Sequence, residues 1–540
     1  MIELIASKIN HPENYETFYG GQYSPEDQKA IDQAMEERNA INNRGPVDIQ
    51  ALVSGKLDEV ELPGVNKPRG HGGPPPSEGK MSDGAKKPEG DGPPEGPMGD
   101  DHDGPPPMMD GPDGAPAEAQ RSGFSGEKDE QGSKRSFGPE GRNGEKRTLR
   151  GRGYGQVMQD TSTTAKNYDP DNRLYFDAEY AKKLGYKDVL VYPLDYTLAG
   201  QWGSAMPKDP LCDTLAVNGL NRIHYFYAPV YPGDKLYAVE DQRDLVDLTP
   251  AEGNEYRTFR MYGHGKVYNQ DGVCVGESIG YVKENLKRYI QRPEGWTREG
   301  FDFPWDSADW WERPAHKYTD EDWEKIKGWW AEEKRRGEDP LYWEDVEVGS
   351  VIPQKVVGPI TEAELGSRYG MSKEPYYTIR EILTDPEKAK DAVKDDMGIY
   401  TWPGNVVRGG GMPGFSFIDR PVFENSVCPH FAIAMLYNWM GDTGWLYKIA
   451  WDIMSIFPHY EGKLPPHPDE PHYISRVPFL KDKTMWTHGL GNDMCIAKGY
   501  VEKKYVQNGD YMVDLIWWLE TIEGDIYEEG EATVKLPRKG

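Results

Sequence analysis

The 540-residue sequence is poor in cysteine and has no long apolar run. Its four cysteines form no Cys-x-x-Cys pair, which predicts buried thiols in a reducing compartment rather than a disulfide framework. No stretch approaches the ~18 consecutive apolar residues of a membrane-spanning helix, and residues 1–10 lack the basic and apolar regions of a secretory signal. These absences predict a cytoplasmic protein that does not contact membranes. The cysteines are Cys212, Cys274, Cys428 and Cys495.

Positive charge is also scarce, because the formal net charge is −28 and the isoelectric point is about 4.9. Such a surface disfavours nonspecific binding to nucleic acid or anionic membranes. One short basic run, from Lys146 to Arg152, stands out from this background. It either binds the phosphates of an anionic ligand, with Arg152 as a candidate contact, or is a solvated linker.

Two segments contain residues typical of ligand sites but lack the spacing that those sites need. The Gly-rich segment 408–414 has no Gly-Lys-Ser/Thr, so nucleotide hydrolysis is not expected. The amides of Gly410 and Gly411 could still hold a phosphate or a thioester oxygen. The histidines and acids of 459–472 are irregularly spaced among prolines, so we expect neither a metal ion nor a cofactor.

Residues 63–145 have a composition that cannot form a core. Between 63 and about 116, roughly half of the residues are Gly or Pro, without the three-residue period of collagen. Too little apolar surface is available to offset chain entropy, so we predict a disordered Gly/Pro-rich insertion. Residues 1–62 are an N-terminal extension with a helix that begins at Ser24-Pro25 and ends near Ala40.

The rest of the chain contains one pattern twice. Each copy has an apolar helix-like stretch, at 193–203 and at 429–441, followed by a strand-rich run. An internal repeat of this size predicts two copies of one small domain packed together. We therefore expect α+β domains at 146–290 and at 341–540, each with a sheet wrapped around one helix.

Turn residues mark the predicted hairpins. Asn269-Gln270-Asp271-Gly272 and Gln507-Asn508-Gly509-Asp510 are typical of tight turns between antiparallel strands. Asp234 and Asp482, each beside a lysine, are interpreted as turn residues at strand entries. Strands are predicted at 224–227, 235–248, 256–268, 273–286, 495–506, 511–522 and 527–536, and a short helix at 177–186.

Residues 291–340 connect the two copies and are rich in tryptophan. Thr319 can cap the amides of a helix that follows it. Trp323, Ile326 and Trp330 share one face of this helix. The pattern predicts a packing brace between the two domains.

Three segments of the two copies carry a family resemblance. They are NRLYFDAEYA (172–181) in the first copy, and WEDVEVGSVIPQKVVGPIT (343–361) and YNWMGDTGWLYK (437–448) in the second. In this order they resemble the MaoC-like acyl dehydratases, specifically the double hot-dog proteins with a FAS1-type dehydratase N-terminal domain. Arg173 stands where proline is usual in the first segment.

The resemblance implies two hot-dog domains in one chain, each a curved antiparallel sheet around a central helix. It also implies hydration of a 2-enoyl thioester of coenzyme A, or the reverse dehydration. This reaction needs a base for water, an acid for the α-carbon and donors for the thioester oxygen. In the family, an Asp-x-Asn-Pro-x-His segment supplies an aspartate and a histidine. Further association is expected, as a homo-oligomer or with another hot-dog chain.

The first copy departs from that segment. Tyr175 stands at the histidine position, and the aspartate position falls on Pro170, next to Asp171. Tyrosine has an unperturbed pKa near 10 and is a poor base at neutral pH. In N-terminal domains of this family such a substitution usually marks the substrate-holding half, so the resemblance implies that the first copy holds the substrate, through Asp171, Asn172 and Tyr175.

The second copy has no such segment between 397 and 429. His430, at the start of the helix, is either the catalytic base, with Asp419 as its partner, or a capping or core histidine. Two functions remain open: an acyl-CoA hydratase or dehydratase, and a non-catalytic acyl-thioester-binding subunit that works with a separate catalytic chain. The missing segment favours the subunit, whereas two domains in one chain favour the enzyme. A thioesterase on the same fold is a third reading.

Overall fold

The computed structural model describes a defined part of the chain. It covers residues 46–54, 156–157, 162–199, 217–247, 256–287, 314–361, 378–401, 428–452, 463–464, 472–486 and 489–540, with the single residues 39, 43 and 364. Contacts divide the chain into Met1–Pro68 with Gly126–Gly540 and a second unit, Arg69–Ser125. The second unit, the predicted insertion at 63–145 and most of the predicted helix at 24–40 lie outside the described residues.

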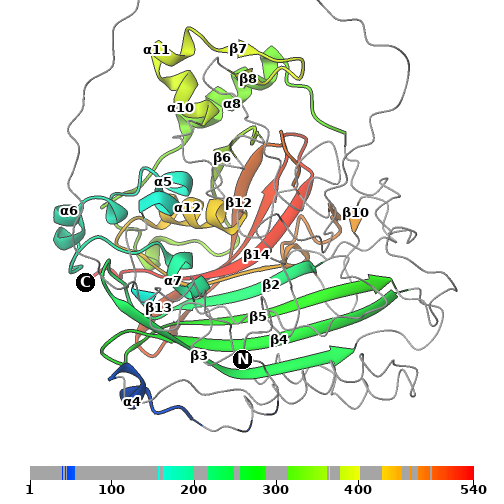
Figure 1. The fold of residues 1–540 in the computed structure, drawn as a ribbon. Coiled ribbons are helices and arrows are strands. Elements are labelled where there is room, and N and C mark those ends of the chain that lie inside the picture. The colour runs from blue at the N-terminus through cyan, green and yellow to red at the C-terminus, as the bar shows by residue number, and fades with distance from the viewer. Residues whose placement is uncertain are drawn as a thin grey trace, which may run out of the picture. The chain divides into compact units, whose positions relative to one another are not determined.

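One mostly antiparallel sheet runs through both repeats, in the order β1-β3-β4-β5-β2-β9-β14-β13-β12-β6 (Figure 1). The first repeat supplies the strands up to β2, and the second supplies the rest. The bounds are β1 Gln156–Val157, β2 Val217–Phe226, β3 Lys235–Asp247, β4 Tyr256–Tyr268, β5 Cys274–Lys287, β6 Val351–Val357, β9 Trp445–Asp452, β12 Cys495–Gln507, β13 Asp510–Glu520 and β14 Ile526–Lys535. The short strands are β7 Val393–Lys394, paired with β8 Tyr400–Thr401, and β10 Lys463–Leu464, paired with β11 Met485–Trp486, which joins β14 in parallel.

The predicted hairpins are confirmed, and one strand is longer than predicted. The turn at Asn269–Gly272 joins β4 to β5, and the turn ending at Gly509 joins β12 to β13. Strand β2 begins at Val217, seven residues before the predicted start at 224. Polar residues and Gly219 interrupt the apolar alternation at the start of β2, so its sequence alone hides that part of the strand.

The two repeats meet edge to edge. Strand β2 pairs with β9 in antiparallel register, with Ile223 opposite Ala450 and His224 opposite Ile449. The backbone hydrogen bonds of this pair turn two sheets into one. The expected double hot-dog architecture is confirmed, with the domains joined through their sheet edges.

Helix α12, Cys428–Met440, is the central helix of the second repeat (Figure 1). Every one of its residues except Trp439 is buried. It packs against the inward side chains of β13, including Leu515, Trp517 and Leu519. It ends at Gly441, which has a φ of +75° and whose backbone N–H donates a hydrogen bond to the Tyr437 carbonyl oxygen. This is the usual glycine C-terminal cap.

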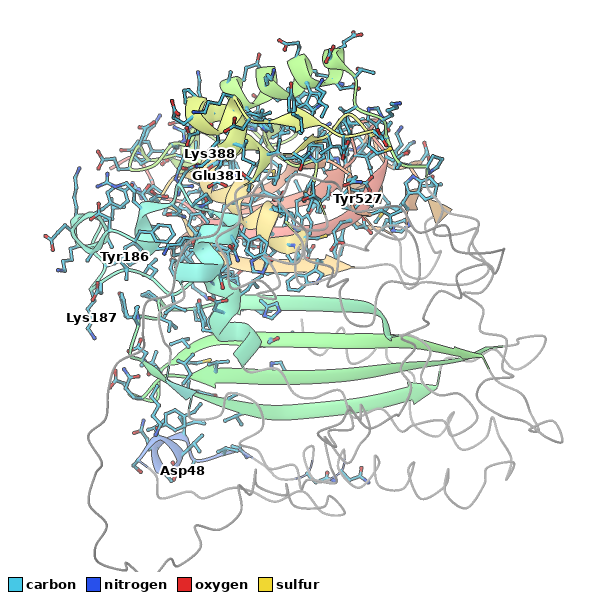
Figure 2. The ribbon with its side chains drawn as sticks, turned by 45° about the horizontal axis from the view of Figure 1, so that its top comes forward. Asp48, Tyr186, Lys187, Glu381, Lys388 and Tyr527 are labelled. Carbon is cyan, nitrogen blue, oxygen red and sulfur yellow. The ribbon has the colours of Figure 1, made fainter. Side chains whose placement is uncertain are left out.

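The first repeat has short helices at the same end of the molecule as α12 (Figure 1). The predicted helix at 177–186 is α6, which Asp177 caps by accepting from the Tyr180 amide. Tyr186 and Lys187 lie in the loop that follows α6 (Figure 2). The helical bounds are α5 Ser162–Tyr168, η1 Arg173–Tyr175, α6 Ala178–Lys183 and α7 Pro193–Ala199; the rest of the predicted helix at 193–203 is outside the described residues.

The connecting segment forms α8, Asp320–Glu332, with the predicted cap at Thr319. Trp323, Ile326 and Trp330 are buried together as predicted. Their described neighbours, such as Val356 and Ile496, belong to the second repeat, so this face braces that repeat. Helix α4, Ile49–Val53, is capped by Asp48 (Figure 2) and packs on β3. The remaining short helices are η5 Trp343–Asp345, α10 Ile379–Thr384, α11 Pro386–Ala389 and η6 Tyr473–Arg476. None of the described helices is long and apolar enough to cross a membrane.

Candidate functional site

His430 lies in the first turn of α12 and is buried. Its ring stacks on Tyr168 of α5, with 4.0 Å between ring centroids and 13° between planes. A second tyrosine, Tyr192, lies 5.2 Å away at the entry of α7. A histidine of the second repeat thus rests on two tyrosines of the first, and the candidate site is shared by both repeats.

Asp195 adds a titratable carboxyl to this junction. It stands in the first turn of α7, three residues after Tyr192. Its backbone N–H donates a hydrogen bond to the Tyr192 carbonyl oxygen. The Thr164 hydroxyl donates to Oδ1 of Asp195 at 3.1 Å. Burial raises the pKa of Asp195 to about 7, against the opposing effect of the Thr164 hydrogen bond. This carboxyl therefore populates both protonation states near neutral pH, as an acid–base catalyst must.

Asp195 could not be identified from the sequence alone, because its surroundings include Thr164, which lies 31 positions away and donates a hydrogen bond to it. One signal was available: an acid in the first turn of an apolar helix, next to the proline that opens it. Acidic residues in the first turn of a helix usually stabilise the helix through its dipole. The position of Asp195 alone therefore does not indicate a catalytic role.

Tyr175 is buried at the histidine position of the family segment. Its ring lies 5.3 Å from Tyr192 and 6.4 Å from Tyr437 of α12. Burial, followed by the neighbouring tyrosines, raises the pKa of Tyr175 well above its usual value. Its hydroxyl stays protonated at neutral pH and can donate a hydrogen bond, but it cannot act as a base.

Asn172 and Asp169 form a buried pair beside Tyr175. The Asn172 amide donates to Asp169 at 2.9 Å, and its carbonyl oxygen accepts from the Leu174 amide as the cap of η1. Asp171 is exposed, so the structure brings Asp169 rather than Asp171 to the cluster. Burial raises the pKa of Asp169, although the charge of Arg335 opposes the change.

Arg335, just after α8, ties the first repeat to the end of α12. Its guanidinium lies 3.4 Å from Asp169, donates to Asn438 at 3.1 Å and donates to Asp442 at 2.5 Å. Tyr180 of α6 donates to the other oxygen of Asp442 at 2.7 Å. We call Asp169, Arg335, Asn438, Asp442 and Tyr180 the clasp. It fixes Asp169, Asn172 and η1 relative to α12.

A small hollow lies beside the tyrosines, with a volume of about 10 Å³. Tyr175, Tyr196 and Tyr437 line it, together with Pro193 and Trp445. A volume of 10–15 Å³ is about the room of one water molecule. The described residues around this hollow therefore do not themselves enclose an acyl chain.

Several predicted residues fall outside the described part: Asp419, Gly410, Gly411 and Arg152. Of the histidines and acids of 459–472, only His472 is among the described residues; it is buried and forms a hydrogen bond with Glu529 of β14 at 2.8 Å. Within the described ranges, no three His, Cys, Asp or Glu side chains gather as a metal site. Cys428 and Cys495 are buried thiols and Cys274 is half-buried, while Cys212 is outside the described part.

One further sequence feature was missed in the second repeat. Ser372-Lys373-Glu374-Pro375-Tyr376-Tyr377 has proline at the fourth place and tyrosine at the sixth, the spacing of the family segment. It stands between β6 and α10 in the chain, well before 397–429. The segment lies outside the described residues.

The comparisons with known proteins agree with this picture for the first repeat. Residues 163–278 match the family profile described as FAS1-like, dehydratase domain region. The match falls within the first repeat, where the sequence resemblance predicted a FAS1-type dehydratase domain, and the strand topology gives the double hot-dog fold. No curated protein sequence matches significantly.

Solved structures with a similar arrangement have low sequence identity. A MaoC domain dehydratase of Chloroflexus aurantiacus is 16% identical, covers 71% of this chain and 93% of its own, and has a TM-score of 0.38. A conserved Mycobacterium tuberculosis protein with a double hotdog fold is 12% identical, covers 70% and 93%, and has a TM-score of 0.35. A MaoC-like dehydratase of Phytophthora capsici is 9% identical, covers 70% and 91%, and has a TM-score of 0.32.

Proposed function

We propose that this chain is an acyl-CoA hydratase or dehydratase, a hydro-lyase that adds or removes water across the 2,3-bond of an enoyl or 3-hydroxyacyl thioester. One observation carries the proposal. His430 of the second repeat stacks on Tyr168 and lies beside the tilted ring of Tyr192, and both tyrosines belong to the segment that matches the dehydratase region. A titratable imidazole is thereby placed where the two repeats meet.

In this proposal two groups of the junction divide the proton transfers. During hydration, the imidazole of His430 takes a proton from water as the water oxygen bonds to C3. The neutral carboxyl of Asp195 gives a proton to C2, and its pKa of about 7 makes this form available at neutral pH. The proton on His430 then returns to Asp195 through solvent before the next turnover. Dehydration is the same sequence in reverse.

The remaining site residues would hold the thioester. The amides of the first turn of α12 could stabilise the enolate-like oxygen. Tyr175 can donate a hydrogen bond to the substrate, since its pKa keeps it protonated. Asn172 would act indirectly, by holding η1 and Tyr175 in place. Asp171, Gly410, Gly411 and Arg152 remain proposed contacts of acyl-CoA, and Asp419 remains the proposed catalytic partner of His430. Association with another hot-dog chain also remains part of the proposal.

The alternative is a non-catalytic subunit that binds acyl thioesters. The observation that favours it is Tyr175, which stands in place of the family histidine and is kept protonated by burial. In that case the junction binds the thioester, and a separate chain supplies the base.

A labelled-water assay separates these functions. Purified protein is incubated with short and long 2-enoyl-CoA esters in ¹⁸O water, while the absorbance of the conjugated thioester is followed. We expect loss of that absorbance and ¹⁸O at C3 of the product. Release of free coenzyme A with ¹⁸O in a carboxylate would instead identify a thioesterase. Saturable binding without turnover would identify the subunit.

A further inference from the structure

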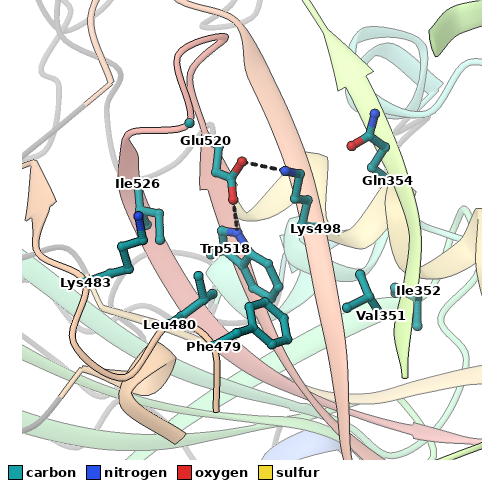
Figure 3. A pocket seen from close by; sticks show the side chains of 11 residues that line it. Val351, Ile352, Gln354, Phe479, Leu480, Lys483, Lys498, Trp518, Glu520 and Ile526 are labelled. Carbon is teal, nitrogen blue, oxygen red and sulfur yellow. Dashed lines mark hydrogen bonds and ion pairs between the residues drawn. The ribbon is translucent and has the colours of Figure 1, made fainter. Parts of the chain in front are cut away.

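A second hollow lies on the opposite side of the second-repeat sheet from α12. It has a volume of about 470 Å³, within the usual range of small-molecule sites. Its walls are the outward side chains of β6, β12 and β13 and the loop 479–483 that follows η6 (Figure 3). None of the described residues of the proposed acyl-thioester site lines it.

This outer face is apolar, which is why part of it is covered. Side chains alternate along β13, so Leu515, Trp517 and Leu519 face α12 while Ile516 and Trp518 face outward. Residues 473–480 pack over the outward side chains with Ile474, Val477 and Leu480. Residues 473–480 do not extend over the hollow itself, so it is left open.

Two large apolar side chains remain open to solvent at the rim of the hollow. Val351 is 52% exposed and Phe479 is 55% exposed, whereas Trp518 behind them is 1% exposed. Phe479 packs edge-on against Trp518, with 6.2 Å between ring centroids (Figure 3). Aliphatic and aromatic surfaces thus line a concave space that an apolar group can fill.

The charges of the hollow are partly neutralised. Glu520 accepts from the Trp518 indole at 2.6 Å and from the Lys498 ammonium at 2.5 Å, so both of its oxygens are engaged (Figure 3). Lys483, on the far side from Val351, has no carboxylate within ion-pair distance among the described residues. Among the described lining residues, Lys483 therefore presents one uncompensated positive charge, in a chain whose net charge is −28.

We propose that this hollow binds a small amphipathic carboxylate, with its apolar body against Val351, Phe479 and Trp518 and its carboxylate at Lys483. A single lysine suits a monoanion. A phosphate is more often held by arginine forks or helix amides, and no arginine is among the described lining residues. A protein partner would need about 800 Å² of interface on each side, far more than two exposed apolar side chains offer. The site is separate from the junction at His430 and does not depend on the proposed function.

The direct test is binding of octanoate to the full chain by calorimetry, with 1-octanol as the uncharged comparison. We expect saturable binding of octanoate and weaker binding of octanol. Lys483→Gln should weaken octanoate binding about threefold to fivefold, as an exposed ion pair does, and leave octanol unchanged. Lys481→Gln is the matched control, because Lys481 is exposed in the same turn but does not line the hollow.

A second pair of variants tests the apolar wall. Val351→Glu puts a like charge beside the ligand and should weaken octanoate binding about tenfold or more. Val348→Glu is the control, because Val348 is 51% exposed and lies outside the hollow. Enoyl-CoA turnover should be unchanged in both valine variants.

Four results would overturn the proposal. Octanoate binding that is absent in the wild type, or equal in all four variants, would remove it. Octanol binding as tightly as octanoate would remove the role of Lys483. A fall in molar mass on light scattering for Val351→Glu but not Val348→Glu would show that this face joins two copies of the chain.

Discussion

Asp195 and His430 show how much of the candidate chemistry depends on individual residues. Neither residue stands in a recognisable catalytic motif, so the role proposed for each depends on the residues around it. His430 is placed by two tyrosine rings of the other repeat, at 4.0 Å and 5.2 Å. Asp195 is placed by Thr164 and changed by burial. The sequence predicted His430 because it follows Pro429 at the start of an apolar helix, which is a local signal.

The raised pKa of Asp195 leads to a prediction about stability. Its carboxyl has a folded-state pKa of about 7 and an unfolded value near 3.9, so the folded state binds the extra proton. Between these two values the stability from this group falls as pH rises, because ionisation is disfavoured in the folded state. Asp195→Asn cannot ionise and can still accept from Thr164. Relative to the wild type, the variant should gain about 2 kcal/mol of unfolding free energy between pH 5.5 and pH 8.5.

Urea denaturation of both proteins at these two pH values measures the gap. A gap that stays constant, or narrows as pH rises, would show that Asp195 is not protonated in the folded protein. Under the proposed function, the same variant should change activity in the opposite direction to stability: Asp195→Asn should lose turnover while it gains unfolding free energy at high pH. A merely structural role would not separate the two.

At the scale of elements, the clasp couples the connecting segment to both repeats. Arg335 bridges Asp169 and Asp442, whose side chains are each 1% exposed. The sequence gives no sign of this, since Arg335 sits in the polar run Lys334-Arg335-Arg336 that reads as solvated surface. Its partners are 166 and 107 residues away, so only the fold reveals the cluster.

Arg335→Met should be strongly destabilising. It leaves two buried carboxylates without their cation, and breaking a buried ion pair in this way costs about 3–5 kcal/mol. Arg336→Met is the control, because Arg336 pairs with Asp339 at the surface and such pairs contribute about 0–1 kcal/mol. Denaturation at pH 7.5 compares the two. Equal losses in the two variants would mean that the clasp does not hold the repeats together.

Gly530 of β14 allows the backbone of β9 and the Trp517 side chain of β13 to lie close to β14. A Cβ there would lie 2.0 Å from the Ala450 carbonyl oxygen and 2.5 Å from the Trp517 ring. Both neighbours belong to the sheet and cannot move easily. The sequence could not have identified this glycine, because its need depends on a neighbouring strand some eighty residues away.

We expect Gly530→Ala to cost about 1–3 kcal/mol of unfolding free energy, the usual result of overpacking. Gly328→Ala in α8 should do the opposite. A Cβ at Gly328 meets nothing within 4 Å, and alanine is better than glycine in a helix by about 0.8–1 kcal/mol. Thermal denaturation of both variants tests the pair. A neutral Gly530→Ala would mean that β9 and β14 pack less closely than described.

At the scale of the whole molecule, the internal repeat was the most informative feature of the sequence. Local signals predicted the helix of the connecting segment, from the Thr319 cap, and the β4–β5 hairpin of the first repeat, from the Asn269–Gly272 turn. They could not predict how the repeats join, because strand pairing between β2 and β9 links residues more than two hundred positions apart. The site shared between the repeats was therefore only half visible: His430 was predicted, and its tyrosine platform was not.

The Gly/Pro-rich segment should be dispensable for folding. Residues 63–145 lack the apolar content to contribute a core, so their deletion should leave the melting temperature within about 2 °C of the wild type. The turnover of an enoyl-CoA ester should also be retained. A drop of ten degrees or more would show that this segment packs on the repeats.

The most direct test of the central claim is turnover of a 2-enoyl-CoA ester by the wild type, His430→Ala and His316→Ala. His316, outside the proposed site, pairs with Asp322 near the start of α8, so it serves as the control. The account predicts hydration by the wild type and by His316→Ala, and a loss of about 10²–10⁴-fold in His430→Ala with the fold retained. Wild-type turnover in His430→Ala, or a wild type that binds acyl-CoA without any turnover, would contradict it.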